Sequence, residues 1–347
     1  MSNVILGTTG ICVNKNGFGA LPIQRIPVED AVNLLLRAYE SGITFFDTAR
    51  FYTDSEFKIG TAFRQIRPHV IIATKTAAAN AELFWKDLST SLEQLQTDYI
   101  DLYQFHNPAF CPKPGDGSGL YEAMLEAKAQ GKIRHIGITN HRLAVAKEAI
   151  ASGLYETLQF PFCYLAAEKE IALVSACRER NMGFIAMKAL SGGLITNGAA
   201  AYAWLDQFDN VLPIWGVQKR TELEEFISYI ENPPAMTPEI TALIQRDREQ
   251  LGGNFCRGCG YCMPCPAGIE INNCARMSLL LRRSPAELQL IPQVQEKMKK
   301  IEGCLHCGKC KKHCPYGLDT PKLLEENYED YKQVLTRYLA DGSLPEA

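Results

Sequence analysis

The chain has 347 residues, of which 46% are hydrophobic and 22% are charged, and its net charge at pH 7 is −3. A chain of this length can bury a large core and still carry a small second domain. The balance of charge gives no reason to expect a protein that binds nucleic acid or an anionic membrane. Apolar runs stay well short of the roughly 18 residues of a membrane helix, and the first residues lack a secretory signal. We therefore expect a cytoplasmic protein in a reducing compartment.

From the N-terminus to about residue 231, short apolar runs rich in β-branched residues alternate with amphipathic stretches of helical period. A glycine-rich segment at Gly17–Ala20 comes first. The predicted strands that follow are 43–47, 70–75, 100–106, 133–139, 157–160, 183–187 and 211–217. The predicted helices are 28–41, 56–65, 81–95, 120–130, 143–152, 168–180, 199–206 and 221–230.

This alternation of strand and helix indicates the fold class. The strands are too continuously apolar to be half exposed, which is typical of a parallel sheet covered by helices. An open doubly wound sheet usually carries G-x-G-x-x-G after its first strand, and this sequence has none there. We predict an α/β fold in which residues 1–240 form a (β/α)8 TIM barrel.

Three consecutive predicted strands end in an ionisable residue, at Asp47, Lys75 and His106, and Tyr52 follows on the loop after Asp47. Each of these has an ordinary explanation, because charges at strand ends are usually solvated and single His or Tyr side chains are usually packed. In a parallel barrel, however, the carboxyl ends of the strands meet at one rim, where active sites lie. The combination therefore favours a catalytic rim.

The last hundred residues differ in composition, because Cys, Pro and Lys accumulate and strand-like runs disappear. We place the domain boundary near residues 235–252, with a hinge at 252–254. Eight of the thirteen cysteines lie in two runs, and the second run, from Cys304 to Pro315, has the spacing C-x2-C-x2-C-x3-C-P of ferredoxin-type [4Fe-4S] ligands. We assign one cluster to Cys256, Cys259, Cys262 and Cys314, and the other to Cys304, Cys307, Cys310 and Cys265.

Residues 241–347 are thus predicted to form a small, mainly helical, ferredoxin-like domain that binds two [4Fe-4S] clusters. The first run is one residue short before Cys265, so this ligand departs from the pattern. Zinc is the alternative, but a tetrahedral site gives no reason for a third Cys-x2-Cys step or a terminal Cys-Pro. Disulfides are disfavoured in a reducing compartment. The remaining cysteines are expected to be small buried hydrophobic residues: Cys12, Cys111, Cys163, Cys177 and Cys274.

The stretches 46–52 and 98–106 and the pair Thr74-Lys75 resemble the aldo/keto reductase family, and the cysteine pattern resembles its branch with a ferredoxin-like extension. The resemblance implies a barrel reductase with Asp47, Tyr52, Lys75 and His106 as its catalytic residues. A carbonyl that receives hydride needs a proton donor at its oxygen, and Tyr52 would be that donor. Lys75 would make the phenol a better acid, Asp47 would hold Lys75, and a neutral His106 would orient the substrate.

The resemblance also implies a nicotinamide dinucleotide, NAD or NADP, on the same rim. Thr139, Asn140 and Gln159 resemble the residues that hold the carboxamide, and Met187, followed by Lys188, takes the position where many relatives place a stacking tyrosine. In the segment that resembles the adenosine-phosphate site, Glu222 replaces an arginine that commonly meets the 2′-phosphate. Lys219 and Arg220 either compensate or are solvated charges that open a helix.

Three functions remain open. The first is an NAD(P)-dependent reductase of a small carbonyl substrate, or alcohol dehydrogenase, with an accessory cluster domain. The second is an oxidoreductase linked to ferredoxin or flavodoxin and independent of nicotinamide, and the third is a non-catalytic iron–sulfur electron carrier or redox sensor. Lys309, Lys311 and Lys312 form a basic patch that suits an acidic electron carrier or is ordinary solvated charge. The clusters either brace their domain or exchange electrons with the barrel site.

Overall fold

The computed structural model describes residues 3–251, 253 and 255–345. The chain divides into two compact units. The first comprises Met1–Ala189 and Gly198–Thr241, and the second comprises Leu190–Asn197 and Ala242–Ala347. The predicted hinge falls on residues 252–254, of which 252 and 254 lie outside the described residues.

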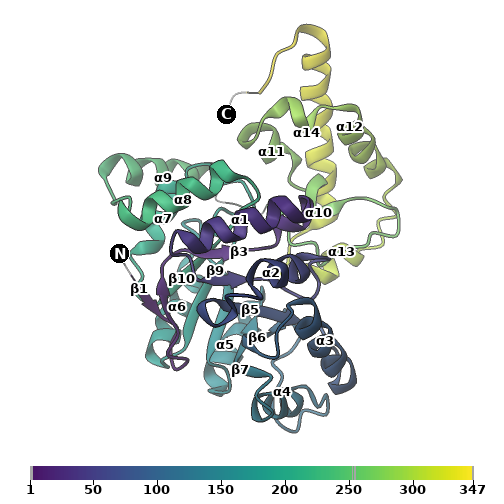
Figure 1. Cartoon of the computed structure of the whole chain (residues 1–347). Coiled ribbons are helices and arrows are strands. Elements are labelled where there is room, and N and C mark those ends of the chain that lie inside the picture. Colours follow the sequence, from purple (N-terminus) through teal and green to yellow (C-terminus); the bar gives the residue numbers. More distant parts are fainter. Residues whose placement is uncertain (1–2, 252, 254, 346–347) are drawn as a thin grey trace. The chain divides into compact units, whose positions relative to one another are not determined.

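The first unit is a closed barrel of parallel strands, as the sequence predicts (Figure 1). Neighbouring strands pair in chain order, and the last strand, β10, pairs with the first barrel strand, β3, to close the ring. The barrel strands are β3 (Gly17–Gly19), β4 (Phe45–Asp47), β5 (Ile71–Thr76), β6 (Ile100–His106), β7 (Ile133–Thr139), β8 (Thr157–Pro161), β9 (Gly183–Met187) and β10 (Val211–Gly216).

Helices follow the barrel strands and lie outside them (Figure 1). In α1, for example, Ala31, Leu34, Leu35 and Ala38 recur at helical spacing and are buried, so one face of the helix packs inward. The helices of this unit are α1 (Val28–Glu40), α2 (Ser55–Phe63), α3 (Ala81–Gln94), α4 (Leu120–Ala129), α5 (Leu143–Ser152), α6 (Glu168–Glu179), α7 (Gly198–Asp206) and α8 (Arg220–Glu231).

An antiparallel hairpin, which the sequence analysis missed, precedes the barrel as β1 (Asn3–Ile5) and β2 (Cys12–Asn14). Val4 and Val13 of this hairpin pack against barrel residues such as Phe45 and Leu212. Because side chains alternate along a strand, the neighbour of Val13, Cys12, points to solvent. The prediction that Cys12 is buried is therefore wrong, whereas the other four cysteines outside the two runs are buried as predicted.

The second unit is mainly helical, again as predicted. It has its own small core, which includes Ile269, Met298 and Tyr331 together with Cys256 and Cys262. Its longest helix, α14, contributes Leu324, Tyr331 and Val334 to that core. The helices after the barrel are α9 (Pro238–Leu251), α10 (Ile271–Cys274), α11 (Met277–Arg283), α12 (Pro292–Lys299), α13 (Lys309–His313) and α14 (Thr320–Asp341).

Within the described part of the chain, none of the helices is both long enough and apolar enough to cross a membrane.

Candidate functional site

Three adjacent strands bring the predicted catalytic residues to one end of the barrel. Asp47 ends β4, Lys75 is the last residue but one of β5, and His106 ends β6. In the parallel register, Lys75 lies opposite Gln104 of β6, and Gln104 comes two residues before His106 on that strand. Tyr52 lies on the loop between β4 and α2. These are carboxyl ends of parallel strands, where barrel enzymes carry their active sites.

Asp47 and Lys75 form a buried ion pair. The Lys75 Nζ donates to both carboxylate oxygens of Asp47 at 2.7 Å and to the Thr48 carbonyl at 2.6 Å. Only 3% of Asp47 and 1% of Lys75 is exposed. Burial raises the pKa of Asp47 and lowers the pKa of Lys75, while the attraction between the two charges opposes both shifts. The three acceptors fix the position of the ammonium group.

Tyr52 and His106 lie beside this pair. Their ring centroids are 5.8 Å apart in an edge-on arrangement, and the Lys75 Nζ is 5.7 Å from the Tyr52 ring centroid. Burial, with a contribution from the positive charge of Lys75, lowers the pKa of His106 to about 3. The imidazole is therefore neutral at pH 7 and has one N–H to donate. The structure thus brings all four predicted side chains together.

A pair of glutamines connects this group to the next strands. Gln104 Nε2 donates to Gln159 Oε1 at 2.9 Å, and Gln159 Nε2 lies 3.4 Å from Asp47 Oδ2. The Thr139 hydroxyl donates to the Gln159 carbonyl at 3.1 Å. The sequence analysis missed Gln104, although it lies two residues before His106 on the same strand and therefore faces the same side.

A second polar network, also missed, holds the loop that carries Tyr52. The Arg50 backbone N–H donates to the Lys75 carbonyl at 3.0 Å, and its guanidinium is hydrogen-bonded to the Glu56 carboxylate. Glu56 is 1% exposed and accepts a 2.6 Å hydrogen bond from the Thr74 hydroxyl. Burial raises the pKa of Glu56. An acidic residue in the first turn of a helix is usually solvated and stabilised by the helix dipole. The sequence alone therefore gave no signal that Glu56 holds the Tyr52 loop.

Of the residues predicted to hold the nicotinamide, three lie close together and two do not share their contacts. Thr139, Gln159 and Met187 lie together, since the Thr139 hydroxyl is 3.8 Å from Met187 Sδ and also bonded to Gln159. Asn140 has a structural contact, because its Nδ2 donates to the Pro108 carbonyl at 2.8 Å. Lys188 follows β9 with a positive φ of 57°, which is uncommon outside glycine.

The start of α8 is occupied by charges of the chain itself. Glu222 Oε2 accepts hydrogen bonds from the backbone N–H groups of Gln218 and Lys219, at 3.0 and 3.1 Å. Arg220 Nε donates to Glu224 Oε1 at 2.6 Å. Glu222 therefore acts as a cap of the helix, and the side chain of Arg220 is engaged with Glu224.

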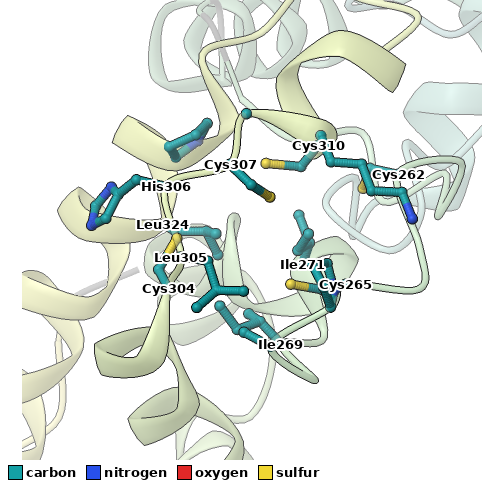
Figure 2. A pocket seen from close by; sticks show the side chains of 15 residues that line it. Cys262, Cys265, Ile269, Ile271, Cys304, Leu305, His306, Cys307, Cys310 and Leu324 are labelled. Carbon is teal, nitrogen blue, oxygen red and sulfur yellow. The ribbon is translucent and has the colours of Figure 1, made fainter.

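The eight clustered cysteines line two pockets of the second unit. One pocket is lined by Cys256, Cys259, Cys262 and Cys314, and the other by Cys262, Cys265, Cys304, Cys307 and Cys310. Figure 2 shows the sulfurs of Cys265, Cys307 and Cys310 pointing into the second pocket. This division agrees with the two ligand sets that the spacing predicts, and Cys262 lines both pockets.

The chemistry of these pockets fits iron–sulfur clusters. Burial, followed by the neighbouring Cys256 and Cys259, raises the pKa of Cys262 to about 12. Thiols brought so close together are stabilised as thiolates when metal ions replace their protons. Among the described residues, no three His, Cys, Asp or Glu side chains converge to hold a single metal ion. The cysteines instead surround two spaces that are partly open to solvent.

A parallel barrel with ionisable residues at its strand ends, followed by a helical unit with two cysteine-lined pockets, defines a barrel protein with an iron–sulfur extension. The sequence model of the Aldo/keto reductase family matches residues 11–202, more than half of the chain, and that of the 4Fe-4S dicluster domain matches residues 255–319. The chain therefore belongs to the aldo/keto reductase family and carries a 4Fe-4S dicluster domain.

Individual relatives agree with this assignment. L-galactose dehydrogenase of Arabidopsis thaliana is 31% identical over 211 residues, which cover 55% of this chain and 66% of that protein. The NADH-specific methylglyoxal reductase of Escherichia coli (strain K12) is 26% identical over 226 residues, covering 56% and 69%. The matches span 60 to 66% of the first three curated relatives. An aldo-keto reductase from Klebsiella pneumoniae in complex with NADPH shares the fold, with a TM-score of 0.61, 22% identity, and coverage of 71% and 94%.

Proposed function

We propose that this chain is an oxidoreductase that interconverts a small aldehyde or ketone and its alcohol by hydride transfer with a nicotinamide dinucleotide. The observation that carries the proposal is the gathering of Tyr52, His106 and the buried Asp47–Lys75 pair at one end of the barrel. The same end holds Thr139, Gln159 and Met187, whose positions suit a nicotinamide ring.

The four side chains have distinct parts in this reaction. When bound, the reduced nicotinamide supplies the hydride to the carbonyl carbon. The Tyr52 hydroxyl donates the proton to the oxygen as negative charge develops there. The positive charge of Lys75 favours loss of that proton, and Asp47 with the Thr48 carbonyl keeps the ammonium in place. Neutral His106 donates its ring N–H to the same oxygen and so orients the carbonyl.

Two relatives support a small oxygen-containing substrate. One is named for L-galactose and the other for methylglyoxal, and both names describe small molecules with carbonyl or hydroxyl groups. One relative is named as NADH-specific, and a protein of the same fold was solved with NADPH. We therefore propose a nicotinamide dinucleotide as the cofactor of the barrel.

Replacement of the phenol tests the proposal. Tyr52→Phe keeps the ring and its contact with His106 but removes the proton donor, so kcat should fall by about 10²–10⁴-fold with little change in KM. The assay is oxidation of NADH and NADPH with a panel of small aldehydes and ketones. Tyr99→Phe is the matched control, because the ring of Tyr99 packs between Arg67 and Arg134 and is not part of the site. Full turnover by Tyr52→Phe would rule out the assigned role.

We also propose that the two pockets hold [4Fe-4S] clusters, one on Cys256, Cys259, Cys262 and Cys314 and the other on Cys304, Cys307, Cys310 and Cys265. Anaerobically prepared protein should contain on the order of eight iron and eight sulfide ions per chain. Replacement of Cys304 and Cys307 by alanine should remove about half of the iron. Cys274→Ala is the control, because Cys274 is buried in the same unit but lines neither pocket.

A further inference from the structure

The two cysteine pockets differ in their exposure to solvent. In the first pocket, Cys256 and Cys262 are buried and Cys259 and Cys314 are half-buried, and Cys262 also lines the second pocket. In the second, Cys307 is exposed, Leu305 beside it is 64% exposed, and the His306 side chain is 68% exposed. A redox group in the second pocket therefore has one exposed ligand, Cys307, at the protein surface.

The segment that contains the eight clustered cysteines is rich in basic residues, although His306 lies 3.7 Å from the exposed Glu325 carboxylate. Residues 255–319 contain ten lysines and arginines against five acidic residues, although the whole chain has a net charge of −3. On α13, Lys309, Lys311 and Lys312 are exposed. Lys311 pairs with Asp319 at 2.8 Å, whereas within the described part of the chain Lys309 and Lys312 form no ion pair. Their positive charge therefore faces solvent uncompensated by a neighbouring carboxylate.

An exposed leucine with uncompensated lysines nearby has the composition of a protein-binding surface. Interfaces bury an apolar centre and keep a charged rim, which steers an oppositely charged partner into place. A long polyanion such as a nucleic acid is a less suitable partner than a small protein. Outside residues 255–319 acidic residues outnumber basic residues, so the rest of the chain would repel it. Complexes that exchange electrons are typically small and transient, so a surface of a few residues is sufficient.

We propose that Leu305, His306, Lys309 and Lys312, here called the Leu305 surface, dock an acidic one-electron carrier protein at the cluster held by Cys304, Cys307, Cys310 and Cys265. In this exchange the reduced carrier loses one electron and is oxidised, and the oxidised cluster gains that electron and is reduced. No bond forms or breaks, and no proton moves. The inference goes beyond the proposed carbonyl chemistry and does not require it.

The experiment follows reduction of the clusters in the holoprotein. An acidic flavodoxin, reduced to its hydroquinone, is mixed with anaerobic protein in a stopped-flow instrument, and loss of visible cluster absorbance is recorded over a range of salt concentrations. The second-order rate should fall as salt screens the attraction. Lys309→Glu/Lys312→Glu should lower the rate at low salt by about tenfold or more. Leu305→Ser should lower the rate while leaving its dependence on salt unchanged.

Two controls keep the result interpretable. Lys332→Glu/Arg337→Glu makes the same change of charge on exposed residues of α14 and should retain the wild-type rate. Dithionite should reduce the clusters of every variant equally, which shows that they are intact. The proposal is overturned if flavodoxin does not reduce the wild type, if the Lys309 and Lys312 reversal has no effect, or if the control lowers the rate equally. Tyr52→Phe should reduce its clusters normally, so failure here is distinct from failure of the carbonyl chemistry.

Discussion

The charge of His106 can be tested through stability. The folded pKa is about 3, and the unfolded value is about 6.5. Between these values the unfolded chain binds a proton that the folded chain does not, so the free energy of unfolding falls as pH is lowered from about 6.5 towards 3. When urea unfolding at pH 7 and at pH 5 is compared, the free energy of unfolding should fall less for His106→Gln than for the wild type. His69→Gln, which changes an exposed histidine, should behave like the wild type. Equal losses in all three proteins would contradict a neutral, partly buried His106.

At the residue scale, the sequence predicted site residues where an ionisable side chain lies at the end of a predicted strand. Asp47, Lys75 and His106 could be predicted because three consecutive apolar strands end in an ionisable residue, and parallel strands end together. The role of Glu56 could not be predicted, since its partner Thr74 becomes a neighbour only when α2 packs beside β5. Cys12 was mispredicted because burial of a small residue depends on which face of the hairpin it occupies.

At the scale of the element, we propose that the start of α8 decides which of the two nicotinamide dinucleotides binds. The Glu222 carboxylate caps the helix through two backbone N–H groups, and by resemblance it lies where the 2′-phosphate of NADP would bind. We expect the wild type to prefer NADH, because the carboxylate repels a phosphate. Glu222→Ala should raise kcat/KM for NADPH relative to NADH by about tenfold. Loss of the cap should also lower the free energy of unfolding by about 1 kcal/mol.

The control for this prediction is Glu231→Ala, which removes an exposed carboxylate at the other end of α8. It should change neither the ratio of the two cofactors nor the stability attributed to the cap. A wild type that uses NADPH better than NADH, or a ratio unaffected by Glu222→Ala, would show that the phosphate does not bind beside this carboxylate.

The strands and helices of the barrel were the part of the structure that the sequence predicted best. The predicted barrel strands and helices agree with the observed ones to within two residues at each end, because continuous apolar runs and helical periodicity are strong local signals. The hairpin of β1 and β2 escaped prediction because its strands have only three residues each. The individual helices of the second unit, α14 included, were also not predicted, since the cysteine pattern specifies ligands and not the elements that carry them.

For the whole molecule, each compact unit has its own core, and we expect only the second to depend on metal ligands for its stability. Its core is small and includes Cys256 and Cys262 themselves, so ligation should supply much of its folding free energy. Calorimetry of the holoprotein should show two unfolding transitions. Removal of iron by a chelator under anaerobic conditions should abolish one transition or strongly lower its midpoint temperature. The transition of the barrel, which contains the Asp47–Lys75 pair, should stay unchanged. Cys274→Ala, with full iron, should keep both. Loss of the barrel transition together with the iron would mean that the barrel folds only when the clusters are present.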